Sequence, residues 1–546
     1  MGIMGVIETL TGNLTYLVLL ILLIVYIPLF FYVKNNPKMA ERGIVTYGPF
    51  IMQKTRRGIE LLDKLARYKR FWRVFGAISK AMAFFLMALI IFILVIDLLL
   101  LPSMMDQGGI GIEYALAIPG LNPLLPLVYG VIGLIVAVVI HEIAHGIQTR
   151  ANDMKVESVG ILYAVVPMGA FVEPNEEQIK KCGRKARSSM YAAGIAINLT
   201  AAIVLFLVLS FGLMGSMSSD FGYRAAVVNV VADSPAADTD IVYSSIIWGI
   251  QTDILKPHDP ETFVAMNYDA LMGHDVTPAD KYIIRFATES NEMNTALIRL
   301  GVFITGVAAG SPAANAHTVG DPSDIVGIPK NSFLISIKGS AVTSMDEFVR
   351  IMDDLVAPGE TVEVVYREYL GGGDVGDDVH VEVRLGERNG DAFLGVNYTF
   401  SGFSLTTPDA VLGSTKNPFS EAESISDVTY AALSYIGMPW RGYSPLPQEV
   451  QWWYHSSFLS DDALWIIMQT VFWIFWLNLV LGVTNALPAV PFDGGYLLMD
   501  GVGYIVDRTR KDDTPEQREK LTAKITSIVS YATLFILLLV MVAILF

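Results

Sequence analysis

Residues 138–146 read Val138-Val139-Ile140-His141-Glu142-Ile143-Ala144-His145-Gly146 and overlap the end of an uncharged run, residues 123–140. Two histidines four residues apart lie on one face of a helix, at a spacing that allows both imidazoles to bind one metal ion. Glu142 lies where its carboxylate can reach a metal-bound water molecule. The uncharged run predicts that this helix is buried in a lipid bilayer, where ionisable residues generally mark a functional site.

The composition predicts a membrane protein rather than a disordered one. The chain has 546 residues, of which 53% are hydrophobic, and its mean hydropathy is positive. The net charge of −16 argues against nucleic acid as a partner. A single cysteine, Cys182, excludes both an intramolecular disulfide and a cysteine-based zinc site.

Six segments are long and apolar enough to cross a bilayer. The loop 34–80 carries twelve Lys/Arg and three acidic residues, and the stretches 149–189 and 505–524 are also rich in Lys/Arg. The positive-inside rule places these loops in the cytoplasm and both termini outside. We therefore expect a multi-pass protein of a prokaryotic cell membrane with its active site near the cytoplasmic side. The predicted spans are 14–33, 81–101, 123–148, 190–213, 463–487 and 523–546.

The apolar stretch 159–172, between the third and fourth spans, is rich in β-forming residues and too short to span the bilayer as a helix. It predicts a β-hairpin that enters the membrane from the cytoplasmic side, where protein must cover its edges. An ordinary surface hairpin is the alternative.

The end of the fifth span supplies a candidate third metal ligand. Pro488 and Pro491 end the helix, and Gly494-Gly495 permit a tight turn, so we expect Asp493 on non-helical backbone at membrane depth. The third and fifth predicted spans run in the same direction, which brings Asp493 to the depth of the histidine pair.

Two histidines and a carboxylate leave one position open for water, as in catalytic zinc sites, although cobalt or iron would also accept these ligands. A membrane-anchored zincin that cuts exposed loops is one alternative, because that class takes a glutamate as its third ligand. The glutamates available downstream are Glu157, Glu173, Glu176 and Glu177.

These motifs together resemble the site-2 proteases, a family of intramembrane zinc metalloproteases. The family pattern Asn-x-x-Pro…Asp-Gly matches Asn485, Pro488, Asp493 and Gly494, and the stretch 194–198 is similar to the family's Gly-Pro-x-x-Asn, with Ile195 in place of proline. The hairpin end Gly169-Ala170-Phe171-Val172 is similar to the family's membrane-reentrant β-segment.

The resemblance implies a zinc metalloendopeptidase with His141, His145 and Asp493 as metal ligands and Glu142 as general base. It also implies cleavage of single-span membrane proteins within or near their transmembrane helices, after another protease has removed the ectodomain. A substrate helix must unwind before its carbonyls can be attacked, and the exposed backbone then needs hydrogen-bonding partners. The candidate substrate-binding residues are Asn198, Asn485, Pro488, Gly169 and Phe171; the two asparagines alternatively bridge neighbouring helices.

The stretch 214–460 differs in composition from the spans, because it carries 32 acidic and 13 basic residues. A β-prone run followed by Ser-Pro-Ala-Ala occurs twice, ending at 234–237 and 311–314. The pattern resembles PDZ domains, for which we expect one or two copies at about 224–300 and 301–400. Such a domain would filter or capture substrates, or act as a spacer. A receptor or chaperone without protease activity is the alternative from another class.

The predicted fold is therefore a polytopic α-helical membrane protein with six transmembrane helices, a membrane-reentrant β-hairpin and an extracytoplasmic α+β PDZ-like insert. Its predicted divisions are 1–122 with two helices and a basic loop, 123–213 with the first half of the protease core, 214–460 with the insert, 461–505 with the second half of the core, and 506–546 with the last helix.

Overall fold

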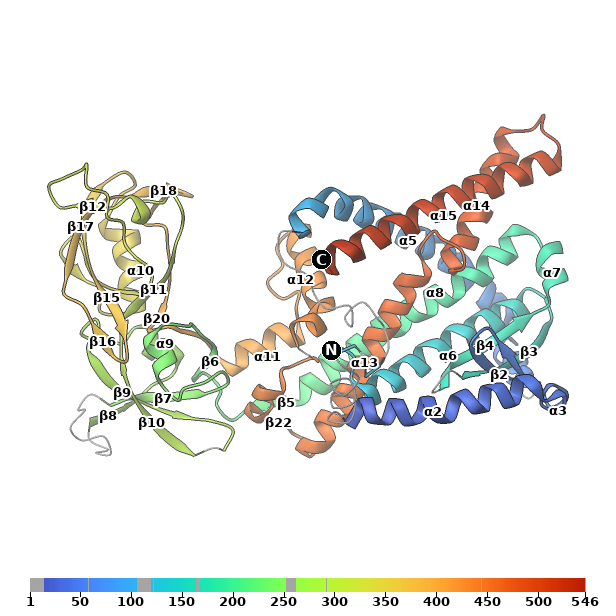
Figure 1. Cartoon of the computed structure of the whole chain (residues 1–546), viewed down its shortest axis with the longest axis horizontal. Helices are drawn as coiled ribbons and strands as arrows, with labels where there is room; N and C mark the ends of the chain where they lie inside the picture. Colours follow the sequence, from blue (N-terminus) through green and yellow to red (C-terminus); the bar gives the residue numbers. More distant parts are fainter. Residues whose placement is uncertain are drawn as a thin grey trace. The chain divides into compact units, whose positions relative to one another are not determined.

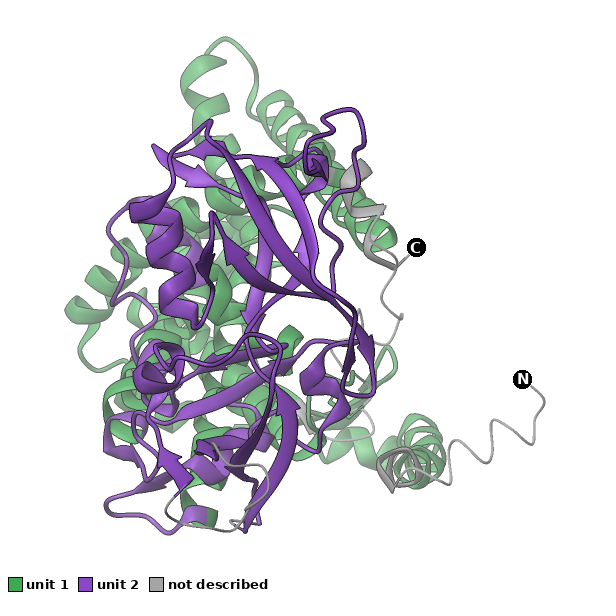
Figure 2. Cartoon of the chain, turned by 90° about the vertical axis from the view of Figure 1, so that its left-hand side faces the viewer, with its two compact units in different colours: residues 1–213, 433–445, 462–546 green, residues 214–432, 446–461 purple. Residues whose placement is uncertain are grey.

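The computed structural model describes residues 14–56, 58–105, 119–120, 122–163, 167–251, 262–290, 292–442 and 444–545. The chain forms two compact units, coloured separately in Figure 2. The first contains residues 1–213, 433–445 and 462–546, and the second contains residues 214–432 and 446–461.

The first unit is built from long apolar helices (Figure 1). Five of the described helices are long and apolar enough to cross a membrane, so the chain is a multi-pass membrane protein. The helix α2 (Leu14–Asn35) contains a shorter apolar stretch, Leu20–Asn35, and the count of six spans therefore stays a prediction. The five are α5 (Lys69–Met105), α6 (Leu127–Ala151), α8 (Arg184–Leu207), α13 (Asp461–Asn485) and α15 (Pro515–Leu545).

The helix α5 begins twelve residues before the predicted span 81–101. Lys and Arg are good helix formers, so the basic residues that end an apolar window do not end the helix. Lys69 and Arg73 of this extension form ion pairs with Asp153, with nitrogen–oxygen distances of 2.5 and 2.6 Å. The first turns of α5 are thereby joined to the loop after α6, which contains Asp153.

Small residues let the helices of the first unit approach closely. A Cβ at Gly133 of α6 would lie 2.8 Å from the carbonyl oxygen of Trp473 in α13. Ala192, Ala193 and Ala196 of α8 are almost completely buried. Such residues are typical of interfaces between membrane helices. The helix α8 is continuous through Ile195, which is fully buried.

The predicted hairpin belongs to a four-stranded antiparallel sheet in the order β1-β2-β3-β4. The predicted pair corresponds to β3 and β4, in which Val159 lies opposite Val172. Its tip, residues 164–166, lies outside the described residues, and its entry into the membrane stays a prediction. The basic loop 34–80 contributes the other two strands, which the sequence analysis did not predict. The strands are β1 (Ile44–Tyr47), β2 (Phe50–Thr55), β3 (Val156–Tyr163) and β4 (Pro167–Pro174).

The strand β4 is an edge of this sheet, because it pairs only with β3 among the described strands. On the other side, β2 and β3 approach so closely that a Cβ at Gly160 would lie 2.1 Å from the Gln53 carbonyl oxygen. The edge strand packs along α6, the helix that carries the two motif histidines.

The second unit contains a large antiparallel sheet and short helices. The ends of its main sheet, in the described part of the chain, are β10 and β12. Its main path runs β10 (Met293–Arg299), β9 (Lys281–Ala287), β7 (Ile246–Gln251), β6 (Ala225–Val230), β21 (Phe403–Thr406), β20 (Val396–Phe400), β11 (Val302–Val307), β13 (Ser332–Ile337), β15 (Thr361–Gly371), β17 (Val379–Arg384) and β12 (His317–Thr318).

Each of the two Ser-Pro-Ala-Ala copies follows a strand and overlaps a short 3₁₀ turn. In the first copy β6 is followed by Pro235–Asp238, and in the second β11 is followed by Ala313–Asn315. Ser344 caps the helix α10 (Met345–Arg350) and accepts a hydrogen bond of 3.1 Å from the Glu347 N–H. This is the hydrogen bond that a serine makes at the N-cap position of a helix.

The described part of the second unit contains a small hydrophobic cluster, formed by Ala279, Phe303, Phe333 and Tyr369, and two larger cores. One is formed by residues between Ala225 and Leu300 together with Phe400 and Phe403, and the other by residues between Val302 and Leu394. The identification of either half as a PDZ domain stays a prediction.

Candidate metal centre

The two motif histidines of α6 face each other near the end of the helix. Their Nε2 atoms are 3.1 Å apart. The Nδ1 atom of His145 lies 2.8 Å from the Met190 carbonyl oxygen of α8, so it carries the proton and donates to that oxygen. The lone pair on Nε2 of His145 is therefore available to a metal, and the backbone of α8 holds the ring in place.

Asp493 lies beside both imidazoles. Its Oδ2 atom is 3.2 Å from Nε2 of His141 and 3.2 Å from Nε2 of His145. This oxygen is buried and has no hydrogen-bond donor among the described residues. A negative oxygen in such a position requires a cation, because an isolated buried charge is strongly unfavourable.

The spacing of these three atoms fits zinc. Tetrahedral coordination with bonds of about 2.0–2.1 Å places ligand atoms about 3.3 Å apart. The observed separations of 3.1 and 3.2 Å are close to that value. The donor set of two imidazoles and one carboxylate is also that of catalytic zinc sites.

Asp493 is the first residue of the helix α14 (Asp493–Thr509). The prediction that it lies on non-helical backbone, followed by a tight turn, is therefore wrong. A Cβ at Gly494 would lie 2.4 Å from the carbonyl oxygens of Ala486 and Leu487. Gly494 and Gly495 are required because the first turn of α14 packs directly on the backbone of the preceding loop. This contact fixes the position of Asp493.

Gly194 of α8 leaves the space that the two imidazole rings occupy. A Cβ at Gly194 would lie 2.6 Å from Nε2 of His145 and 2.6 Å from Cε1 of His141. The backbone of α8 thus forms one wall of the metal centre, and any side chain there would collide with the ligands.

The carboxylate of Glu142 contacts the edge of the four-stranded sheet. Its Oε2 atom accepts a hydrogen bond of 3.0 Å from the Val172 N–H of β4. Because β4 is an edge strand, this backbone donor points away from the sheet and toward α6. Glu142 therefore lies between the histidine pair and the edge strand β4.

Buried contacts between α8 and α14 fix the helix that carries Asp493. Arg187 forms an ion pair with Asp500, with Nε 2.9 Å from Oδ1, and Ser188 donates to the other carboxylate oxygen at 2.9 Å. One turn nearer the metal centre, the rings of Tyr191 and Tyr496 stack at 4.8 Å. The sequence analysis missed these residues; the only signal was an acidic residue, Asp500, after the Asp-Gly motif.

Asn198 lies one helical turn from Gly194 on α8. Its side chain is fully buried, and neither amide atom has a hydrogen-bond partner among the described residues. Asn485 donates from Nδ2 to the Leu481 carbonyl oxygen at 3.1 Å, so it is bonded within its own helix. Of the two predicted amides, Asn198 alone has its hydrogen-bonding capacity entirely unused in the described part of the chain.

The other predicted substrate residues make close packing contacts. Pro488 is buried, and Ser530 donates to its carbonyl oxygen at 3.5 Å. A Cβ at Gly169 would lie 2.5 Å from Cγ1 of Val138, so this glycine lets β4 pack on α6. The Phe171 ring covers Gly160 of the neighbouring strand. Their roles in substrate binding stay predictions.

The four glutamates considered as alternative third ligands have other partners. Glu173 accepts hydrogen bonds from Lys54 and Ser158, and Glu157 accepts one from Asn175. The remaining two, Glu176 and Glu177, pair with lysines one turn later on the same short helix. Among the described residues, the group able to hold a metal with the two histidines contains Asp493.

Comparison with known proteins gives two matches. A sequence model of peptidase family M50 matches residues 129–539, which is more than half of the chain. An uncharacterized protein of Methanocaldococcus jannaschii is 31% identical over 172 residues, which cover 31% of this chain and 46% of that protein. The match thus spans less than half of the length of that relative.

Proposed function

Because the chain belongs to peptidase family M50, the site-2 protease family, we propose that it is a zinc-dependent intramembrane protease. Its substrates would be single-span membrane proteins, cleaved within or near their transmembrane helices. The observation that carries the proposal is the cluster of His141, His145 and Asp493, which brings the apolar helix α6 and the start of α14 together around one set of ligand atoms. Ionisable clusters in such surroundings are functional sites by default.

In this proposal the side chains of His141, His145 and Asp493 would hold zinc, which as a Lewis acid would activate water and polarise the scissile carbonyl. Glu142, adjacent to His141, takes a proton from the attacking water and returns it to the leaving amine. Met190 keeps the Nδ1 proton on His145. The buried amide of Asn198, which can both donate and accept, binds substrate backbone that has unwound from its helix.

The edge strand β4 supports binding of an extended substrate. An extended peptide adds to a sheet edge through backbone hydrogen bonds, and side-chain pockets then give specificity. Val172 and Glu142 are hydrogen-bonded to each other at this edge. A substrate segment paired with β4 would therefore lie beside the general base.

We further propose that residues 214–460 act as a PDZ-like filter on the extracytoplasmic side, which admits substrates only after their ectodomain is shortened. The strand and 3₁₀ turn that recur in the two halves support this assignment. Deletion of the whole region would then allow cleavage of a substrate that retains a folded ectodomain.

The test uses the full chain reconstituted in liposomes with a single-span substrate. We expect Glu142→Gln to retain one zinc per chain and lose cleavage, and His141→Ala to lose both. If the protein only binds membrane helices, the wild type and Glu142→Gln should leave the same amount of uncleaved substrate. Zinc and cleavage that survive Asp493→Ala would instead support a zincin with another third ligand.

A further inference from the structure

A crevice of about 570 Å³ lies between α5, α8 and α14, and its lining contains none of His141, His145 and Asp493. One end is lined by the cationic side chains of Lys80, Arg184 and Lys185. The apolar side chains of Phe84, Met87, Leu498 and Ile505 also line it. On α5, Phe84 and Met87 lie one and two turns beyond Lys80, within the apolar part of the helix. The crevice therefore changes from cationic to apolar along the helix.

The cations of the crevice exceed its anions. Arg184 forms an ion pair with Asp507, and the lining carboxylate of Asp500 is almost completely buried in its pair with Arg187. Lys80 donates to a neutral group, the Lys185 carbonyl oxygen, at 3.3 Å. In the described ranges no carboxylate lies within ion-pair distance of the ammonium of Lys80 or Lys185. Two positive charges thus face the crevice without neutralisation.

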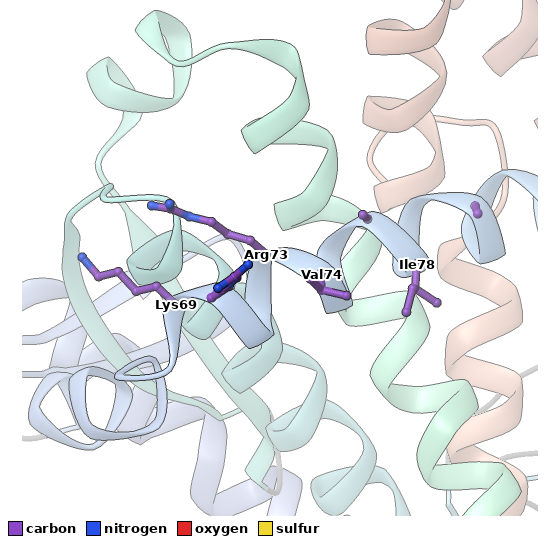
Figure 3. A pocket seen from close by; sticks show the side chains of 7 residues that line it. Lys69, Arg73, Val74 and Ile78 are labelled. Carbon is purple, nitrogen blue, oxygen red and sulfur yellow. The ribbon is translucent and has the colours of Figure 1, made fainter.

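A neighbouring depression on α5 shows the contrast (Figure 3). Lys69, Arg73, Val74 and Ile78 line it, so it also has cationic and apolar parts. However, Lys69 and Arg73 are paired with Asp153 at 2.5 and 2.6 Å. That one carboxylate offsets one of the three positive charges of Lys69, Arg70 and Arg73, and only α5 contributes to the lining. The depression therefore lacks the apolar walls from several helices that the crevice has.

We propose that the crevice between α5, α8 and α14 binds an anionic phospholipid. Lys80 and Lys185 bind the phosphate of the headgroup, and an acyl chain lies along Phe84, Met87 and Leu498. The charge of the crevice selects an anion, and its apolar walls select a ligand that carries a hydrocarbon chain. Helices of a multi-pass membrane protein present surfaces of this kind to lipid at the edge of the bilayer, which argues against a small soluble anion.

The test measures lipid binding by native mass spectrometry of the full chain in detergent. The probes are palmitoyl-oleoyl phosphatidylglycerol, the corresponding phosphatidylcholine, and glycerol phosphate. We expect phosphatidylglycerol to bind more tightly than the other two. Each lysine near a membrane surface contributes about a five-fold gain in affinity. The variant Lys80→Gln/Lys185→Gln should therefore bind phosphatidylglycerol about 25-fold more weakly. Its binding of phosphatidylcholine should fall much less, because the choline cation already neutralises that phosphate.

Matched variants separate this site from general attraction. Arg70→Gln removes an exposed cation from the neighbouring depression and should change phosphatidylglycerol affinity less than two-fold, and Lys80→Arg/Lys185→Arg should keep the affinity. Phe84→Ala should weaken the binding of phosphatidylglycerol but not the binding of glycerol phosphate. An Arg70→Gln effect as large as that of the double lysine variant would overturn the proposal. Glycerol phosphate binding as tight as that of the lipid would also overturn it, because the site would then be one for a free phosphate ester.

Discussion

Replacement of Gly194 by alanine tests how tightly the backbone of α8 confines the metal ligands. The added methyl group would lie 2.6 Å from Nε2 of His145, the atom that faces the metal. An ordinary van der Waals contact needs at least about 3.4 Å, so the overlap is about 0.8 Å. The helix cannot turn away, because the Met190 carbonyl oxygen one turn earlier is bonded to the same imidazole.

The expected cost follows from overpacking, which typically amounts to about 1–3 kcal/mol. Since the collision is with the ligands themselves, most of this cost should appear in metal binding, as a loss of about 5- to 150-fold in zinc affinity. Zinc affinity is measured by competition with a chromophoric chelator on the purified full chain. Thermal unfolding of the metal-free protein reports separately on the fold, and its midpoint should change little.

Two other glycines supply matched controls. A Cβ at Gly482 of α13 would lie 3.3 Å from the Leu199 side chain, and a Cβ at Gly413 in α11 (Pro408–Lys416) would meet no atom within 4 Å. Gly482→Ala should therefore have a small effect on zinc affinity, and Gly413→Ala none. If Gly194→Ala binds zinc as tightly as the Gly413→Ala control, then α8 does not confine the imidazoles and the reasoning is refuted.

Three further predictions concern the surroundings of the metal centre. Arg187→Gln leaves the buried carboxylate of Asp500 without its cationic partner, so it should lower the free energy of unfolding by about 3–5 kcal/mol. The measurement is thermal unfolding in detergent. A loss below about 1 kcal/mol, as is typical of a surface ion pair, would contradict this prediction. Gly494→Ala places a methyl group 2.4 Å from two backbone carbonyl oxygens and should abolish zinc binding, measured by metal analysis after gel filtration; a folded variant with full zinc content would contradict this. Hydrogen bonds from Lys54, and then from Ser158, hold the pKa of Glu173 below its usual range. The ionised carboxylate therefore stabilises the sheet above the pKa of an unfolded glutamate, and this contribution is lost as the pH falls through the lowered value. The difference in melting temperature between wild type and Glu173→Gln should thus disappear in acid, and a difference that grows in acid would exclude this account.

The ligand residues could be identified from the sequence because each half of the site is a local pattern. His141 and His145 are related by helical periodicity, and Asp493 lies in a short motif at the end of a span. The helix α15 also begins at a local signal, a capping box in which the Gln517 N–H donates to Thr514 Oγ1 at 3.3 Å and the Thr514 N–H donates to Gln517 Oε1 at 2.8 Å.

The features that the sequence analysis missed depend on contacts between distant segments. Arg187 and Asp500 are 313 residues apart, and neither belongs to a periodic pattern that would pair them. The strands β1 and β2 lie in a basic loop whose composition does not predict a sheet. They join one because β2 pairs with the distant strand β3 and β1 pairs with β2. The helical conformation of Asp493 follows from the close approach of Gly494 to the preceding loop, which no local propensity encodes.

The hydrogen bond from the Val172 N–H to Glu142 ties the resting state of the carboxylate to the edge strand β4. A peptide that pairs with β4 at Val172 would compete for the same N–H group and release the carboxylate. Arrival of the substrate would then switch on proton transfer, and an empty enzyme would keep its base occupied.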